Sequence, residues 1–222
     1  MLNRKTLHKH TKAFTMMELV FVIVVLGILA ALALPRMERD IRQEAADNIL
    51  SAIRYTQHLA LNDDKTNPFL DDWQKSLWTI RFSSDGDHYT IGSDMNREGN
   101  IDKIEAAIDP VNGKYIYNNS ATPQADESPD IFLNKKYGIT NIAITGGCGN
   151  PAGTATSTLH IAFDNLGRPF RGVSVATNNY DRYINQDCIL TFSAANAFPG
   201  EPIDVNISRE TGYAYVVGQE DL

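Results

Sequence analysis

The chain has 222 residues and a formal net charge of −7, from 20 Lys plus Arg against 27 Asp plus Glu. This length suits one globular domain with a substantial core. The acidic balance disfavours nonspecific binding to nucleic acid, whose affinity comes mainly from cations at phosphates, so no nucleic-acid partner is expected.

The first predicted element is an apolar helix over residues 14–34. Its 21 residues would extend roughly 31 Å, about the thickness of a bilayer's hydrocarbon core. Residues 1–13 ahead of it contain four cations and no acid, so the positive-inside rule keeps this end cytoplasmic. We therefore expect a single-pass membrane chain with most of its mass beyond Pro35, on the outer side.

Glu18 is the anomaly in this apolar helix. An ionised carboxylate well inside a bilayer costs at least about 2.5 to 3.5 kcal/mol on insertion scales, and such residues usually have a partner. No Lys or Arg lies between Ala13 and Pro35. A cut just before Phe14 would supply the missing cation, because it creates an α-amino group one helical turn away, on the same subunit or on a neighbour.

These residues resemble the N-terminal signal of type IV pilins and type II secretion pseudopilins. The residues that carry the resemblance are Lys12, Ala13, Phe14, Thr15, Glu18 and Pro35, with the apolar run between the last two. The resemblance implies that a prepilin peptidase cuts between Ala13 and Phe14 and methylates the new amine. It also implies that Glu18 pairs with the N-terminus of an adjacent subunit during assembly. This chain departs from the usual pattern at Ala13, where Gly is usual, and at Met16 and Met17, where branched apolar residues are commoner.

Two simpler interpretations of the N-terminus stay open. The stretch Ala31, Leu32, Ala33 after a basic and apolar run is also typical of a secretory signal with an A-x-A cleavage site, although such a run is usually shorter and has no acid. A plain membrane anchor would explain the length and the flanking charges. Neither alternative explains Glu18.

The helical pattern continues through residues 35–61 as an amphipathic segment. Its apolar stripe recurs every three to four positions, at Met37, Ile41, Ala45, Ile49, Ile53 and Ala60. Together with residues 14–34 it predicts a helix of roughly 72 Å. Pro35 lacks the N–H that would bond the carbonyl of Ala31, which predicts a kink or local melting there. Asn62, Asp63 and Asp64 are expected to end the helix.

Residues 62–222 are expected to form a β-rich globular domain. Residues 78–82 and 89–91 alternate apolar and polar side chains around Asp85, Gly86 and Asp87, which predicts a hairpin. Further strands are expected at 115–117, 142–145, 159–163, 188–192, 203–207 and 213–217. Residues 118–130 and 146–153 read as surface loops. The predicted fold class is α+β, with a long N-terminal helix packed on a mostly antiparallel, pilin-like sheet.

A second, looser resemblance lies near the C-terminus. The residues Phe163, Asp164, Gly167, Arg168 and Pro169, with the closing stretches IDVNIS and TGYAYV around Gly212, are similar to the globular domain of the H-type minor pseudopilins and related minor pilins. A tight turn at Gly167 and Pro169 would explain the same residues without any family relationship.

Cys148 and Cys188 lie on the predicted outer side of the membrane. In an oxidising compartment they are expected to pair, and closing that loop would contribute roughly 3 to 4 kcal/mol in the chain-entropy model. The alternative, a metal site with two cysteines, lacks other ligands at suitable spacing.

The stretch from Asp94 to Glu105, DMNREGNIDKIE, has oxygen-bearing residues at the spacing of an EF-hand loop. The candidate calcium ligands are Asp94, Asn96, Glu98, Asn100 through its backbone carbonyl, Asp102 and Glu105. Gly99 stands at the sixth position, where the loop turns sharply. Because a strand-like run precedes this stretch instead of a helix, it predicts either a calcium-binding turn or a solvated acidic loop, and no other cofactor is expected.

An enzyme is not expected, since no H-E-x-x-H, C-x-x-C or complete G-x-S-x-G motif occurs. The main hypothesis is a minor pseudopilin of a type II secretion system, placed in the bacterial inner membrane with its globular domain in the periplasm. The resemblance implies a role at or near the filament tip. Its partners would be other pseudopilins, prepilin peptidase, the inner-membrane assembly platform and membrane lipid. The alternatives are a minor pilin of a type IV pilus, for adhesion, motility or DNA uptake, and a membrane-anchored enzyme or binding domain.

Overall fold

The computed structural model describes residues 15–83, 85–120, 122–148, 159–178, 181–194 and 201–219, and within the first range it does not describe the side chains of residues 31–40. The chain divides into two compact units, Met1–Arg39 and Asp40–Leu222. One helix, α1 (Met16–Leu61), runs through both. Its backbone stays helical through Pro35, so the helix does not melt there, and the predicted kink stays a prediction.

The second half of α1 buries the predicted stripe. Ala45, Ile49 and Ile53 have no exposed surface, and Ala60 is 1 % exposed. Ile41 is half-buried and packs against the same core, whereas the side chain of Met37 lies outside the described residues. A helix with one apolar face is stable when that face packs on another element, and here it packs on the sheets.

The predicted residues end α1. The side-chain amide of Asn62 donates to the carbonyl oxygen of His58 at 2.7 Å. Asp63 then accepts a hydrogen bond from the indole Nε1 of Trp78 at 2.9 Å, which ties the chain after the helix to the first strand.

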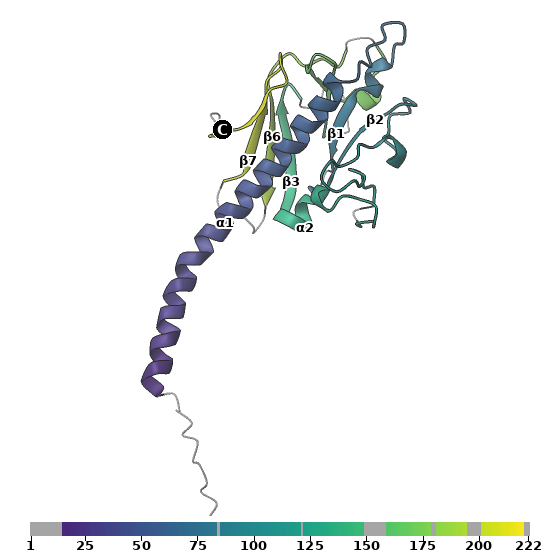
Figure 1. Cartoon of the computed structure of the whole chain (residues 1–222). Coiled ribbons are helices and arrows are strands. Elements are labelled where there is room, and N and C mark those ends of the chain that lie inside the picture. The colour runs from purple at the N-terminus through teal and green to yellow at the C-terminus, as the bar shows by residue number, and fades with distance from the viewer. Residues whose placement is uncertain are drawn as a thin grey trace, which may run out of the picture. The chain divides into compact units, whose positions relative to one another are not determined.

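The strands form two four-stranded antiparallel sheets instead of the single sheet that was predicted. The first sheet has the order β2-β1-β4-β5 and the second has the order β3-β6-β7-β8. Figure 1 labels β1 and β2 of the first sheet and β3, β6 and β7 of the second. The first sheet contains β1 (Trp78–Phe82), β2 (Tyr89–Ser93), β4 (His160–Phe163) and β5 (Pro169–Arg171). The second contains β3 (Ile139–Gly146), β6 (Cys188–Ala194), β7 (Ile203–Ile207) and β8 (Ala214–Val216).

Alternation along the strands decides which face is buried. In β7 the residues Ile203, Val205 and Ile207 are fully buried, and the residues between them are half-buried. One main core collects such residues from both sheets and from α1. The rings of Phe82 and Phe192, 5.3 Å apart, join the two sheets. This is the pattern of antiparallel sheets with one face on a core.

The predicted strands are confirmed except the one at residues 115–117. The hairpin is present, with Trp78 opposite Ser93 and Phe82 opposite Tyr89. Residues 115–117 make only isolated bridges, because their N–H and C=O groups are divided among several loops. The strand β5 and the short helix α2 (Leu133–Tyr137) were not predicted, since three and five residues are too few to show a period.

The segment 118–130 lies mostly at the surface, as predicted, but it contains a few buried polar residues. Asn118 and Glu127 are each 4 % exposed. The carboxylate of Glu127 accepts hydrogen bonds from the Asn118 amide at 2.8 Å and from the Gln124 N–H at 2.9 Å. Because these polar groups bond one another, Asn118 and Glu127 can be buried at little energetic penalty.

Candidate functional site

Glu18 lies in the first turn of α1 and forms a capping box with Thr15. The Thr15 backbone N–H donates to Glu18 Oε2 at 2.9 Å and the Thr15 hydroxyl donates to the same oxygen at 3.0 Å. In return, the Glu18 N–H donates to the Thr15 hydroxyl at 3.2 Å. Such reciprocal bonds satisfy N–H groups that have no partner inside the helix.

The capping box changes how the Glu18 carboxylate is understood. The apolar part of the helix offers this carboxylate no Lys or Arg, and the structure supplies neutral donors from Thr15 instead. The T-x-x-E spacing ahead of an apolar run is itself a capping-box signature, so this feature could have been predicted from the sequence, although it was not. Since Gln can take the place of Glu in a capping box, capping alone does not require a charge.

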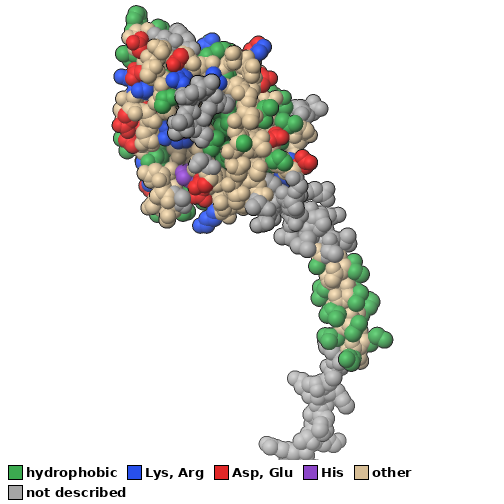
Figure 2. All heavy atoms as spheres, turned by 180° about the vertical axis from the view of Figure 1, so that it is seen from behind, with side chains coloured by type: hydrophobic (Ala, Val, Ile, Leu, Met, Phe, Trp, Pro, Cys, Tyr) green, Lys and Arg blue, Asp and Glu red, His purple; other side chains and the backbone are tan. Residues whose placement is uncertain are grey.

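The helix around Glu18 is apolar on every side. The large side chains from Met16 to Leu29 are 37 % exposed or more, and they form the green stretch of helix in Figure 2. A helix that is apolar all round is stable in water only when other apolar groups cover it. In the described part of the chain, no helix combines the length and the hydropathy needed to cross a membrane.

The proposed cleavage site falls outside the described residues. Ala13 and Phe14 both belong to residues 1–14, for which no placement is described. The side chains of Pro35 and of the alternative cleavage stretch at residues 31–33 are also not described. Cleavage before Phe14 and a role for Pro35 in assembly therefore stay predictions.

The disulfide between Cys148 and Cys188 is confirmed. The two Cα atoms are 5.1 Å apart, and both cysteines are buried. Cys188 begins β6 and pairs with Gly146, the last residue of β3, so the disulfide fastens this end of the second sheet.

The turn after β4 is built around the buried carboxylate of Asp164. Its Oδ1 accepts the backbone N–H groups of Leu166 and Arg168 at 3.0 and 2.8 Å. Its Oδ2 accepts Nε and Nη2 of Arg168 at 2.8 and 2.6 Å. The F-D-x-x-G-R stretch is therefore a hydrogen-bonded turn, and both of its charged residues, Asp164 and Arg168, stabilise it.

The helix holds this turn against the turn that precedes β8. The amide Nε2 of Gln57 donates to the carbonyl oxygens of Gly167 at 3.0 Å and Thr211 at 2.8 Å. Gly167 and Gly212 have φ values of +79° and +67°, in the left-handed region that favours glycine. Residues that are far apart in sequence thus meet at one point on α1.

The acidic stretch from Asp94 to Glu105 forms a loop closed by its own carboxylates. Asp94 accepts the N–H groups of Glu98 at 3.2 Å and Gly99 at 2.7 Å. Glu105 accepts the N–H groups of Met95, Asn96 and Asp102. The side-chain oxygen of Asn100 accepts from Arg81 instead of facing the loop.

The side chains of this loop are not arranged as a metal-binding cluster. In the described part of the chain, no three His, Cys, Asp or Glu side chains are arranged to hold a metal ion. Burial raises the pKa of Asp94, and the neighbouring charge of Glu105 adds to this, while the N–H bonds from Gly99 and Glu98 oppose it. Calcium binding at Asp94, Asn96, Glu98, Asn100, Asp102 and Glu105 therefore stays a proposal, which requires these oxygens to exchange N–H donors for the ion.

Calcium titration tests this proposal on the intact chain in detergent micelles. If the loop binds calcium, the melting temperature rises with calcium, and at a concentration 100 times the Kd the stabilisation is about 2.7 kcal/mol. Magnesium at equal ionic strength is the control for screening. An unchanged melting temperature at millimolar calcium would retire the site.

Comparison with known proteins supports the interpretation of the N-terminal segment as a prepilin-type motif, and it gives no match for the rest of the chain. Residues 8–34 match the model of the prokaryotic N-terminal methylation motif. No curated protein and no solved structure gave a match. The matched segment includes the proposed cut, Thr15 and Glu18, and it ends just before Pro35.

The chain therefore carries a prepilin-type N-terminal motif, which is typical of type IV pilins and pseudopilins. The motif implies processing by a prepilin peptidase, anchoring in the inner membrane before assembly, and assembly with other pilins. Pilin-like proteins are structural subunits and not enzymes. The motif does not distinguish a secretion pseudopilus from a type IV pilus.

Proposed function

We propose that this chain is a minor pseudopilin of a type II secretion system, cut before Phe14 and assembled into a short periplasmic filament at or near its tip. In this proposal residues 14–34 lie in the inner membrane before assembly. The leader of residues 1–13 is cytoplasmic, and the domain from residue 62 onward is periplasmic.

The observation that carries the proposal is a single carboxylate inside the matched motif. Glu18 is the one acid among the residues from Phe14 to Pro35. Its capping bonds come from Thr15 alone and leave its negative charge without a cation among the described residues. An α-amino group on Phe14 of a neighbouring subunit would neutralise that charge in an apolar setting, where an unpaired charge is most costly.

Two substitutions at Glu18 separate charge pairing from helix capping. Glu18→Gln keeps a side chain that can complete the capping box but removes the charge, whereas Glu18→Ala removes both. If pairing with an amine drives assembly, both variants reach the membrane and are cut, and both incorporate into filaments at least about tenfold less, or about 1.4 kcal/mol. Crosslinking to neighbouring subunits measures incorporation, and mass spectrometry of the mature N-terminus measures cleavage.

The matched control is Thr15→Ala, which removes the capping hydroxyl and keeps the charge of Glu18. It is expected to weaken the first helical turn by about 1 kcal/mol and to incorporate nearly normally. Normal incorporation of Glu18→Gln would contradict amine pairing and leave capping as the role of Glu18. A mature chain that begins at any residue other than Phe14 would contradict the processing step.

The alternative is a minor pilin of a type IV pilus, because the same motif occurs in both machines. Deleting the gene in its native host decides between them. Loss of protein secretion with intact pili is the outcome expected for a pseudopilin. Loss of pili with intact secretion would replace the proposal by the alternative.

A further inference from the structure

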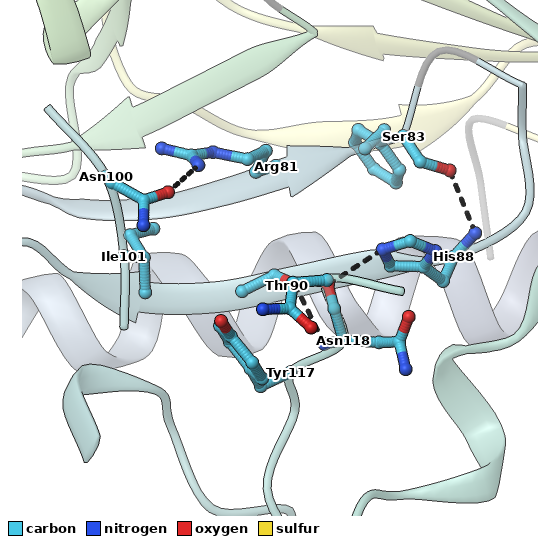
Figure 3. Close-up of a pocket in the computed structure, with 10 residues that line it drawn as sticks. Arg81, Ser83, His88, Thr90, Asn100, Ile101, Tyr117 and Asn118 are labelled. Atoms are coloured by element: carbon cyan, nitrogen blue, oxygen red, sulfur yellow. Dashed lines mark hydrogen bonds between the residues drawn. The ribbon is translucent and has the colours of Figure 1, made fainter. Parts of the chain in front are cut away.

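The first sheet carries a polar pocket that none of the features above uses. Strand alternation sends Ile80 and Phe82 of β1 into the main core, so Arg81 points to the opposite face. There it lies across from Thr90 of β2. Two later segments, residues 100–101 and 117–119, cover this part of the face and leave a cavity of about 230 Å³ (Figure 3).

Arg81 lines this pocket and forms no ion pair with a described residue. Its Nη1 donates to the Asn100 side-chain oxygen at 2.9 Å. Its Nε is buried and has no acceptor among the described residues. None of the ion pairs in the described part of the chain includes Arg81. Burial lowers the pKa of Arg81, which the more distant charge of Asp94 offsets only in part.

His88, which also lines the pocket, has a ring nitrogen that forms no hydrogen bond with the described residues. His88 shares a hydrogen bond between its Nε2 and the Asn118 carbonyl oxygen at 2.9 Å. Its Nδ1 is buried without a hydrogen-bond partner, and Asp87 Oδ2 lies 3.9 Å from it, too far for a hydrogen bond. Figure 3 shows Arg81 and His88 above and beside the space that Thr90 and Tyr117 border from below.

The charge of the lining is unusual for this chain. The ten residues around the cavity include one arginine, one histidine and no acid, in a sequence with 27 Asp plus Glu. Buried charged groups in proteins are nearly always paired, since an unpaired one is expensive to desolvate. A half-buried arginine that borders a cavity and forms no ion pair among the described residues can therefore take an anion from outside them.

We propose that this pocket binds a small oxyanion, a carboxylate or phosphate group, which Arg81 neutralises. A cavity of about 230 Å³ holds roughly seven groups of water size at about 30 Å³ each, so the ligand is a small molecule or a free ion. Asn100, Thr90 and Tyr117 supply the polar groups that would complete its hydrogen bonds.

Calorimetric titration of the full chain in detergent micelles tests the proposal. The probes are inorganic phosphate and succinate, each as the sodium salt with sodium chloride as the ionic-strength control. At least one probe is expected to bind saturably, and the comparison shows whether phosphate or carboxylate is preferred. Arg81→Gln is expected to weaken that binding at least about tenfold. Arg209→Gln, which replaces an exposed arginine, is the matched control and keeps wild-type affinity.

Melting curves make the test independent of whether one variant folds well. The bound probe is expected to raise the melting temperature of the wild type and not that of Arg81→Gln. If Arg81→Gln does not fold, Asn100→Ala and Tyr117→Phe decide, because each removes one polar group at the pocket and each should weaken binding several-fold. Absence of saturable binding at about 10 mM probe, or equal affinity in the wild type and the pocket variants, overturns the proposal.

Discussion

Gly212→Ala is expected to destabilise the globular part by about 2 to 4 kcal/mol, because the added Cβ has no room. It would overlap the carbonyl oxygen of Gly167 and lie 2.6 Å from Nε2 of Gln57. The oxygen belongs to the backbone of the Asp164 turn, which cannot move without breaking the bonds that hold it. Overpacking of this kind costs about 1 to 3 kcal/mol, and the left-handed conformation adds about 1 kcal/mol.

Urea unfolding followed by tryptophan fluorescence measures this effect. Both tryptophans of the chain, Trp73 and Trp78, lie in the unit Asp40–Leu222. The matched control is Gly113→Ala, since Gly113 also has a positive φ, +71°, but no atom lies within 4 Å of its added Cβ. The control should lose about 1 kcal/mol of unfolding free energy, which is the cost of the left-handed backbone conformation alone. Equal losses at the two glycines would show that the contact among the turns and Gln57 is not tight.

Acid is expected to destabilise the fold through His160, whose pKa burial lowers to about 3, with a smaller contribution from the charge of Arg81. Arg81 is its cross-strand neighbour. The unfolded chain binds a proton at His160 near its ordinary pKa of 6.5, and the folded chain does not until about pH 3. Between these values the unfolded state holds more protons, so stability falls as the pH is lowered. The full effect is about 4 to 5 kcal/mol.

His160→Gln isolates this contribution, because glutamine does not titrate. Between pH 6.5 and pH 5 few carboxylates titrate, and the wild type should lose up to about 1.4 kcal/mol per pH unit from this group. In the variant that slope is expected to be absent. Urea unfolding at several pH values measures the slope, and the control His58→Gln replaces an exposed histidine. The same slope in the wild type and in His160→Gln would contradict the assignment.

Much of the fold could be predicted from local patterns. The end of the long helix at Leu61 follows from the loss of the apolar stripe at Asn62, and the hairpin of β1 and β2 follows from alternation around Gly86. The division into two sheets could not be predicted, because alternation tells which residues face a core but not which strands are neighbours. The short strand β5 was missed for a related reason, since its pairing with β4 and not its own sequence makes it a strand.

The candidate sites also differ in how far the sequence could predict them. Cys148 and Cys188 could be paired from the sequence, because they are its two cysteines. The acidic loop could not be judged from spacing, since Asp94 and Glu105 bond backbone N–H groups whose positions depend on the folded loop. Nothing in the sequence indicated that Arg81 borders a cavity, because an arginine in an alternating strand is expected to face water.

By itself, the sequence determined the N-terminal motif, the class of the fold and the acid that stands alone in an apolar helix. These depend on the order and spacing of neighbouring residues, which the chain carries before it folds. The tertiary structure alone decided that Gln57 joins two distant turns, that the half-buried His160 lies beside Arg81, and that Arg81 borders a cavity without forming an ion pair among the described residues. Each of these is a contact between segments far apart in the chain, and such contacts exist only once the strands have paired and the loops have packed over them.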